Sequence, residues 1–284
     1  MAKIDVNRIY QGDASNLLLS RTRFPSKSVS LIMTSPPYAE KRKNSYGGIP
    51  EDKYIEWFLP ISKELKRILK NDGSFVLNIK EGANGERQTY VLELILELRK
   101  QGWLWTEEYI WHKTTCMPGK WPNRFRDAWE RCLHFTKNKK FKMYQNEVRQ
   151  PIGDWAEKRL NNLKPYDNKR IESASDSGLS RKVSNWKGRS LVYPSNVLEF
   201  APVSKNTNHS AAYPKDLPLW FIRLFTKKGD LVLDPFIGSG TTAIACIESE
   251  RRFLGIEIKK SYFKLANKNV KSALNNKNLE TIKV

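Results

Sequence analysis

The sequence predicts an α/β protein whose central β-sheet is mostly parallel and is covered by helices on both faces. Short apolar runs rich in β-branched residues alternate along the chain with longer stretches in which apolar residues recur at helical spacing. Strands that are buried on both faces read as continuous apolar runs, and alternating strands and helices favour a parallel arrangement. The 284 residues, 39% of them hydrophobic, are enough for one large domain of this class or for two modest ones.

Residues 1–113 contain the first half of this pattern. The run Val29–Met33 predicts a buried strand, which must end before Pro36 and Pro37 because consecutive prolines cannot continue a strand ladder. Asn71-Asp72-Gly73 is expected to stop the helix that precedes it. The elements expected after Pro37 are a helix over Tyr54–Leu69, a strand over Ser74–Ile79, a helix over Thr89–Lys100 and a strand over Trp105–Trp111.

Residues 114–200 differ in composition and predict a loop-rich module inserted into the α/β body. Periodicity fades there, and residues 113–200 hold 19 Lys and Arg against 9 Asp and Glu. Residues 201–284 then return to the α/β pattern. The elements expected in this last part are a helix over Pro214–Phe225, a strand over Asp230–Leu233, a helix over Thr242–Ser249, a strand over Arg252–Ile256 and a final helix over Tyr262–Leu274.

The charge balance favours a polyanionic partner. Lys and Arg total 50 against 30 Asp and Glu, a net charge of +20, and each basic contact to a phosphate is favoured by the release of counterions. One candidate cluster for contacts to such a partner, in the inserted module, consists of Lys137, Lys139, Lys140 and Lys142. No apolar run of 18 residues occurs, and Met1–Ser15 lacks the apolar core of a signal peptide, so no membrane association is expected.

The three cysteines predict neither a disulfide framework nor a metal site. Cys116, Cys132 and Cys246 are far apart in the sequence, form no Cys-x-x-Cys pair and do not cluster with histidines. Thiols in this pattern fit a reducing compartment, so the expected location is the cytoplasm.

The segment Leu231–Glu257 has the strand, glycine turn, helix, strand and acid that are typical of a nucleoside-cofactor site. Gly238 and Gly240 allow a sharp turn and a close approach of the backbone to a ligand. Glu257, at the end of the second strand, suits a bidentate hydrogen bond to two ribose hydroxyls. The dinucleotide pattern G-x-G-x-x-G is not met, since position 243 is Ala, so a cofactor without a phosphate is favoured.

Ser35-Pro36-Pro37-Tyr38 follows a buried strand and could hold an amino group. The prolines fix the directions of the Ser35 hydroxyl and the Pro36 carbonyl, and these two acceptors could take both hydrogens of an –NH₂ group. The lone pair of an exocyclic amine is conjugated into its ring; acceptors that favour a pyramidal nitrogen free that pair and stabilise the charge that develops in the transition state. The Tyr38 ring offers a face for stacking a base, and Tyr38→Phe, which keeps the ring, is expected to be mild.

These two motifs together resemble those of the β class of DNA amino-methyltransferases, found mainly in bacterial restriction–modification systems. Thr34–Tyr38 resembles the catalytic motif and Asp234–Thr242 the cofactor motif, with the recognition region between them. The resemblance implies a Rossmann-like, doubly wound mixed sheet that is circularly permuted, with the catalytic half over 1–113, the target-recognition region over 114–200 and the cofactor half over 201–284. It also implies S-adenosylmethionine as the cofactor and double-stranded DNA as the partner.

The resemblance further assigns roles to individual residues. Asp13 matches an acid near the cofactor adenine, and His209 lies in a segment that wraps the methionine end of the cofactor. The strand that precedes the recognition region is matched by Trp129–Phe135. The implied catalytic residues are Ser35, Pro36, Pro37 and Tyr38, and the implied cofactor-binding residues are Asp13, Thr34, His209, Asp234, Pro235, Phe236, Gly238, Ser239, Gly240, Thr241, Thr242 and Glu257.

The residue at position 35 bears on the target base. In the family, Ser there accompanies mostly methylation of cytosine N4, and Asp accompanies mostly methylation of adenine N6; Ser35 therefore favours cytosine. Methylation of cytosine C5 is disfavoured because it needs a thiolate nucleophile, usually in a Pro-Cys pair, and no cysteine follows a proline. Two alternatives stay open: an adenine N6 enzyme on the same scaffold, and a non-catalytic nucleic-acid-binding subunit. The sequence decides neither the oligomeric state, monomer or homodimer, nor whether a cognate restriction endonuclease acts on the same site.

Overall fold

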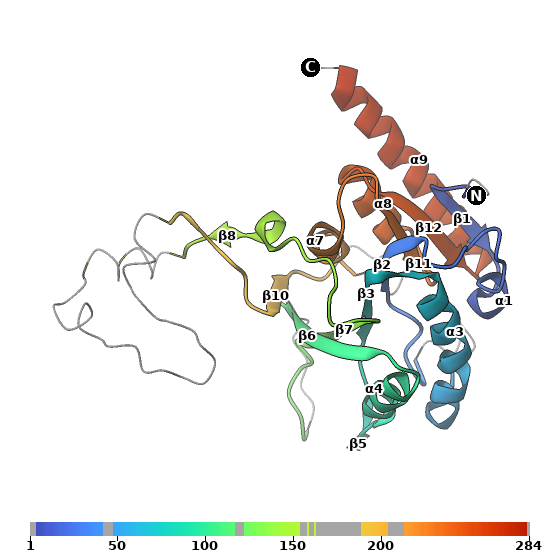
Figure 1. The fold of residues 1–284 in the computed structure, drawn as a ribbon. Helices are drawn as coiled ribbons and strands as arrows, with labels where there is room; N and C mark the ends of the chain where they lie inside the picture. Colours follow the sequence, from blue (N-terminus) through green and yellow to red (C-terminus); the bar gives the residue numbers. More distant parts are fainter. Residues whose placement is uncertain are drawn as a thin grey trace. The chain divides into compact units, whose positions relative to one another are not determined.

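Eight strands form a single mixed sheet within the larger of two compact units (Figure 1). The structure, a computed structural model, describes residues 4–41, 48–116, 122–153, 158, 162, 189–203 and 213–282. The strand order in the sheet is β1-β12-β11-β2-β3-β7-β6-β10. The strands span Arg8–Gln11 (β1), Val29–Thr34 (β2), Leu69–Ile79 (β3), Leu104–Lys113 (β6), Trp129–Thr136 (β7), Val197–Phe200 (β10), Leu231–Asp234 (β11) and Arg252–Glu257 (β12).

Strand β7 runs in the opposite direction to the other strands of this sheet. The neighbours from β1 to β3 pair in parallel, β7 pairs antiparallel with both β3 and β6, and β10 pairs parallel with β6. The amino end of β7 therefore meets the carboxyl ends of the other strands. We call this side the carboxyl end of the sheet, and the opposite side the amino end.

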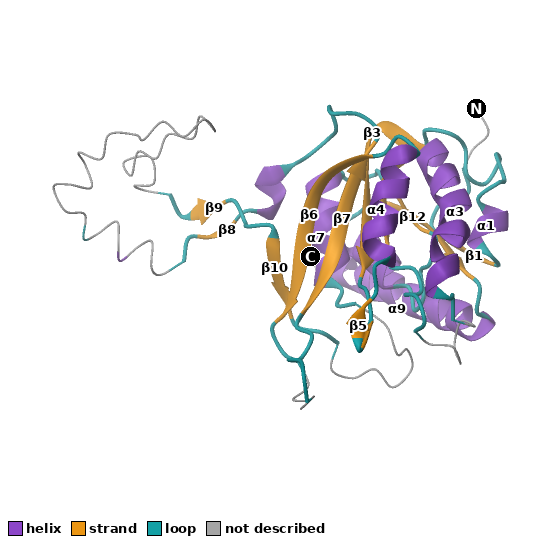
Figure 2. Cartoon of the chain, turned by 90° about the horizontal axis from the view of Figure 1, so that it is seen from below, coloured by secondary structure: helices purple, strands orange, loops and turns teal. Residues whose placement is uncertain are grey.

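Two groups of helices cover the two faces of the sheet (Figure 2). Helices α1 (Ala14–Leu17), α3 (Tyr54–Ile68) and α4 (Tyr90–Lys100) pack on one face. Helices α7 (Asp216–Phe225), α8 (Thr241–Glu248) and α9 (Lys260–Ile282) pack on the other. Strands β2 and β11 are buried along their whole length, as the continuous apolar runs predict. The expected α/β class with a mixed, doubly covered sheet is confirmed, and the half with Ser35 precedes the half with the glycine turn.

One expected helix stop is wrong. Helix α3 ends at Ile68, and Asn71-Asp72-Gly73 lies inside β3, which begins at Leu69. The pairing of β2 with β3 is irregular at this point, because Val29 is opposite Leu69 whereas Leu31 is opposite Ser74. A Cβ atom on Gly73 would lie 2.8 Å from the Ser30 carbonyl oxygen. The glycine is therefore needed for a close approach of two strands and not for a helix end.

The smaller unit comprises residues 145–195. Its described elements are the short 3-10 helix η2 (Gln145–Val148) and two short antiparallel strands, β8 (Gln150–Pro151) and β9 (Leu191–Val192). The Tyr193 hydroxyl donates to Asn146 Oδ1 over 3.2 Å within this unit. These bounds are narrower than the sequence-based range 114–200, because β7 and β10 fall within that range but pair in the central sheet.

His134 on β7 is a titratable side chain inside the core. It is 1% exposed, its Nε2 lies 2.9 Å from Ser74 Oγ, and its Nδ1 has no hydrogen-bond partner among the described residues. Its ring packs on Phe225 with 4.5 Å between centroids. Burial lowers the pKa of His134 to about 3, so the folded protein holds the neutral imidazole.

We predict that His134 makes the fold acid-sensitive. In the unfolded chain a histidine takes up a proton below about pH 6.5, whereas in the folded protein it does so only near pH 3, so acid favours unfolding by up to about 1.4 kcal/mol per pH unit between these values. His134→Phe should flatten this part of a stability–pH profile measured by urea unfolding. His112→Asn, at a side chain that is 44% exposed, is the control. An equal slope in His134→Phe and the wild type would contradict the prediction.

Candidate active site

The carboxyl end of the sheet brings together the two sequence motifs. Strands β11 and β2 are neighbours, with Leu233 opposite Ile32, so Asp234 at the end of β11 lies beside the point where Ser35 follows β2. On the other side of β11, Gln11 of β1 lies opposite Glu257 of β12, which brings Asp13 to the same end. Residues that are far apart in the sequence thus meet because the carboxyl ends of parallel strands lie side by side.

Asp234 is the buried centre of this region, with 1% of its surface exposed. Its Oδ1 accepts hydrogen bonds from Thr34 Oγ1 at 2.6 Å and from the Phe236 amide at 3.1 Å. Its Oδ2 accepts from Thr242 Oγ1, and from the Tyr213 hydroxyl at 3.1 Å. Burial raises the pKa of Asp234, whereas the donors from Thr242 and Thr34 act to lower it. Both carboxylate oxygens are thus engaged inside the protein, so Asp234 connects the two motifs.

The Glu257 carboxylate holds the glycine turn through a hydrogen bond to its backbone. This side chain is 3% exposed; its Oε2 accepts the Gly238 amide at 2.9 Å and its Oε1 the Lys259 amide at 2.8 Å. Burial raises the pKa of Glu257, and the two amide donors oppose that shift. Gly240, with φ of 91°, packs on α9, where its Cβ would lie 3.3 Å from Ala266. The sequence-predicted acid and turn are therefore in direct contact.

Other expected cofactor residues surround this turn. Asp13 caps α1 through Oδ1, which accepts from the Ser15 amide at 2.8 Å, and the preceding Gly12 amide donates to the Glu257 carbonyl at 3.0 Å. The half-buried Phe236 ring packs on Trp57 of α3 with 5.7 Å between centroids. Asn269 of α9 donates to the Ser239 carbonyl. Of the remaining expected residues, Pro235 is buried and Thr241 begins α8, whereas His209 lies outside the described residues.

Helix α3 contacts the Ser35–Tyr38 loop and holds its backbone. Pro36 is buried, and the Tyr54 hydroxyl donates to the Pro37 carbonyl at 2.9 Å. Ser35 Oγ donates to the Tyr38 hydroxyl at 3.3 Å, and that hydroxyl donates to Glu130 Oε2 at 2.7 Å. Burial, and next the Glu130 carboxylate, raise the pKa of Tyr38 well above its usual value, so its phenol stays protonated. The loop thus has a fixed backbone and a defined direction of hydrogen bonding.

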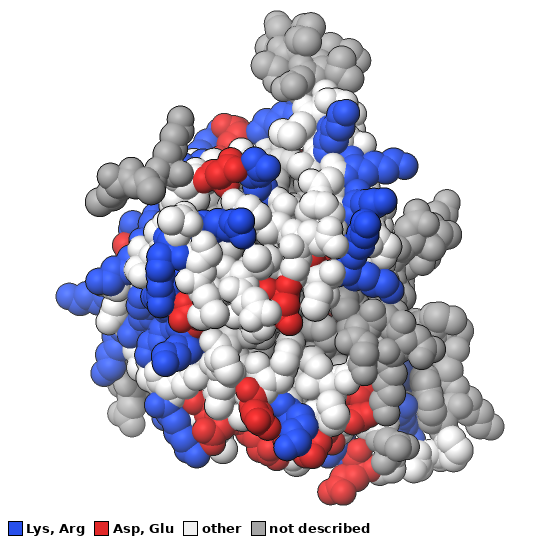
Figure 3. Space-filling view, turned by 90° about the vertical axis from the view of Figure 1, so that its right-hand side faces the viewer, with Lys and Arg blue, Asp and Glu red and all other residues white. Residues whose placement is uncertain are grey.

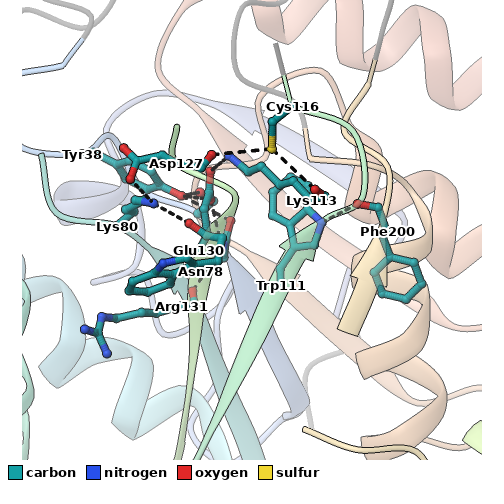
Figure 4. A network of polar contacts seen from close by, with 12 residues as sticks. Tyr38, Asn78, Lys80, Trp111, Lys113, Cys116, Asp127, Glu130, Arg131 and Phe200 are labelled. Atoms are coloured by element: carbon teal, nitrogen blue, oxygen red, sulfur yellow. Dashed lines mark hydrogen bonds and ion pairs between the residues drawn. The ribbon is translucent and has the colours of Figure 1, made fainter. Parts of the chain in front are cut away.

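Sequence reasoning missed the polar network on β3, β6 and β7 beside this loop (Figure 4). Glu130 accepts from Lys113 Nζ at 2.6 Å and from Asn78 Nδ2 at 3.2 Å. Lys80 donates to the Trp129 carbonyl at 2.6 Å and pairs with Asp127 at 3.1 Å. One signal was available: Asn78 is a polar residue in the apolar run Ser74–Ile79. The contact with Glu130 was not predictable, because it depends on the antiparallel register of β7.

The structure does not bring the lysine cluster of 137–142 to this site. These residues follow the carboxyl end of β7, which lies at the amino end of the sheet. Lys137 Nζ donates to the Leu69 carbonyl at 2.7 Å and Lys142 pairs with Asp72 at 2.9 Å, so both contact the beginning of β3. Basic side chains are also spread in several groups over the face shown in Figure 3. The DNA contacts expected of this cluster stay a prediction.

We predict that the Thr34–Asp234 hydrogen bond contributes measurably to stability. Thr34→Val keeps the shape but removes the hydroxyl donor, leaving a buried carboxylate oxygen with one partner fewer, which should cost about 1–3 kcal/mol. Urea unfolding measures this loss. Thr22→Val, at an exposed threonine, is the matched control and should change the free energy of unfolding little. Equal stability of the two variants would show that the bond is dispensable.

The comparisons with known proteins agree with this geometry. The Type II methyltransferase M.PvuII of Proteus hauseri is 32% identical over 277 residues, which cover 89% of this chain and 80% of that protein. The DNA adenine methyltransferase YhdJ of Escherichia coli (strain K12) is 28% identical over 278 residues, covering 92% and 81%.

Solved structures also match. The PvuII DNA methyltransferase (cytosine-N4-specific) has a TM-score of 0.69 at 25% identity, covering 96% of this chain and 93% of that one. TTHA0409 of Thermus thermophilus, complexed with S-adenosyl-L-methionine, has a TM-score of 0.60 at 25% identity and covers 94% and 93%. The family model described as DNA methylase matches residues 29–268, which include both motifs. With that match and the likeness to M.PvuII, the chain belongs to the DNA methylase family.

Proposed function

We propose that the chain is a site-specific DNA methyltransferase that transfers a methyl group from S-adenosylmethionine to the N4 amine of cytosine in duplex DNA. The observation that carries this proposal is the junction of β2 and β11. There Ser35 and Pro36 directly follow β2, the strand next to β11 and its glycine turn, and Thr34 is bonded to Asp234. The groups proposed to bind the amine and the cofactor thus follow neighbouring strands at one end of the sheet.

The donor and acceptor chemistry at this end fits S-adenosylmethionine. Glu257 is a buried carboxylate at the glycine turn, suited to accept from two ribose hydroxyls. Asp13 is half-buried beside it and would accept from the adenine amine. Gly238, with φ of 55°, keeps the turn open to a close ligand. When bound, the cofactor supplies an electrophilic methyl group on a sulfonium. Phe236 and Gly238 would line its pocket, and the buried Asp234 would hold that lining in position.

The residues of the Ser35–Tyr38 loop would act on the target amine. Ser35 Oγ and the Pro36 carbonyl would accept its two hydrogens. Because positive charge develops on the nitrogen during direct transfer, these acceptors would stabilise the transition state more than the bound ground state. The Tyr38 ring offers a stacking face for a base that has left the helix. Further rate enhancement would come from holding the amine in line with the methyl group, and direct transfer needs no covalent intermediate.

The choice of cytosine N4 is supported by Ser at position 35 and by the cytosine-N4-specific PvuII enzyme among the similar structures. Adenine N6 is the second candidate, because YhdJ, an adenine methyltransferase, matches 92% of this chain. Attack through a thiolate of Cys132 or Cys246 is disfavoured. Burial raises the pKa of the Cys132 and Cys246 thiols, which keeps both protonated.

Recognition of the DNA sequence would come from the region 114–200, which holds the unit 145–195. Its basic composition supports contacts to phosphates, and such contacts position a protein without reading the sequence. We further propose a restriction endonuclease for the same site as a functional partner, since M.PvuII and several other relatives are Type II methyltransferases. No described helix is long and apolar enough to cross a membrane.

Mass spectrometry of nucleosides tests the proposed reaction. DNA that lacks prior methylation is incubated with the protein and S-adenosylmethionine and then digested. The expected product is N4-methylcytosine. If N6-methyladenine forms instead, the chain is an adenine N6 methyltransferase, the second candidate. The absence of both products, together with DNA binding, would support a non-catalytic nucleic-acid-binding protein.

Glu257 is expected to determine cofactor affinity. Glu257→Gln keeps an acceptor for the Gly238 amide but removes the charge, and should weaken S-adenosylmethionine binding by about 2–3 kcal/mol in a calorimetric titration. Glu97→Gln on α4, whose side chain pairs with Lys100, is the control. Unchanged affinity in Glu257→Gln would remove this residue from the cofactor site.

Ser35 is expected to act on the rate of methyl transfer. Ser35→Ala removes one acceptor for the amine and should lower the single-turnover rate by roughly 10²–10³. Cofactor affinity should stay normal, because the hydrogen bond described for the Ser35 side chain goes to Tyr38 and not to the glycine turn. Rapid-quench assays and calorimetry measure the two quantities separately. A full single-turnover rate in Ser35→Ala would refute the amine-binding role.

A further inference from the structure

The role proposed for Ser35 raises the question of where its own hydroxyl hydrogen points. A hydroxyl has one hydrogen to donate and two lone pairs with which to accept. If the Ser35 hydrogen pointed at the target amine, it would oppose the accepting role and compete with the amine hydrogens. The site therefore needs a second group that takes the Ser35 hydrogen away from the base.

The structure contains such a group in Tyr38. Ser35 Oγ donates to the Tyr38 oxygen over 3.3 Å, which leaves the lone pairs of Ser35 free to accept elsewhere. Tyr38 can take this hydrogen only if its own hydrogen points in another direction. That hydrogen is donated to Glu130 Oε2 at 2.7 Å, and Asn78 Oδ1 lies 3.3 Å from the same hydroxyl as a weaker acceptor.

Glu130 ends this chain of hydrogen bonds because an ionised carboxylate can only accept. Lys113 Nζ lies 2.6 Å from its other oxygen, and the Glu130 side chain is 13% exposed, so this charge is paired and largely shielded from water. Asn78 Nδ2 donates to Glu130 Oε2 at 3.2 Å and to the Arg131 carbonyl at 3.1 Å. Since a carbonyl cannot donate, the Asn78 amide has one orientation, with its oxygen toward Tyr38.

We propose that Glu130 is a positioning residue, which sets the direction of the chain Ser35–Tyr38–Glu130 and thereby keeps the Ser35 oxygen an acceptor for the target amine. This inference rests on the proposed function, because it assumes that Ser35 receives an amine. Lys113 and Asn78 hold the Glu130 carboxylate in place. The Tyr38 hydroxyl thereby acquires a role beyond the stacking face of its ring, which changes the expectation for Tyr38→Phe.

The test compares Glu130→Gln, Tyr38→Phe and the double variant. Glutamine has nearly the shape of glutamate, but its amide can donate to Tyr38, so the direction of the chain is no longer fixed. Each single variant should lower the single-turnover rate by roughly 10- to 100-fold, less than the 10²–10³ expected for a group that touches the developing charge. The double variant should be no slower than the slower single variant, because Glu130 acts on Ser35 only through the Tyr38 hydroxyl, which Tyr38→Phe removes.

Two further measurements separate positioning from a merely structural role. Affinities for S-adenosylmethionine and for DNA should stay at wild-type values in Glu130→Gln, with the loss confined to the rate. Glu97→Gln is the matched control, since its side chain lies in the last turn of α4 and pairs only with Lys100 among the described side chains. Thermal unfolding reports whether Glu130→Gln folds. If it does not, the rate of Tyr38→Phe decides the question.

Three results would overturn the inference: a wild-type rate in Glu130→Gln, a wild-type rate in Tyr38→Phe, or rate losses that multiply in the double variant. None of these would affect the proposed function, which depends on the methylated product formed by the wild type. Conversely, if the wild type makes no methylated base, the proposed function fails first, and a mutant series is not needed to show it.

Discussion

The candidate active site depends on a hydrogen bond between two residues that are 200 positions apart in the sequence. Thr34 ends β2 and Asp234 ends β11, and the bond between their side chains fixes these strand ends relative to each other. Asp234 also holds the Phe236 amide and the Thr242 hydroxyl, so one buried carboxylate organises the backbone of the glycine turn. Ser35 directly follows Thr34. The acceptor proposed for the amine and the turn proposed for the cofactor are therefore positioned by the same group.

The antiparallel direction of β7 determines which residues lie beside the Ser35–Tyr38 loop. If β7 ran parallel to β3, its carboxyl end with Thr136 would lie beside the Ser35–Tyr38 loop, and Glu130 would lie at the amino end of the sheet. The antiparallel register instead pairs Asn78 with Cys132 and brings Glu130 next to Tyr38. The same reversal carries residues 137–142 away from the site. The direction of β7 thus explains both why Glu130 lies in the candidate site and why residues 137–142 lie outside it.

The sequence predicted the parts of the fold that depend on local pattern. Continuous apolar runs located β2, β11 and β12, and the glycine turn with its acid was identifiable because the contact between Gly238 and Glu257 follows from a strand–turn–helix–strand unit. What failed depended on tertiary contacts. Gly73 was interpreted as a helix stop, although its small size serves the approach of β3 to Ser30. The hydrogen bonds that Thr34 and Tyr213 donate to Asp234 were likewise not predictable, because both donors lie far from Asp234 in the sequence.

The pairing of early strands with late ones has a consequence for the order of folding. A chain emerges from the ribosome with its amino terminus first. β1 pairs only with β12 among the described strands, and one side of β2 pairs with β11. Until residues 231–257 have been made, β2 therefore has an open side with unpaired amides and carbonyls, which can attract other extended chains. Contacts of such long sequence separation also form slowly. The arrival of β11 covers this exposed strand and assembles the active site in the same step.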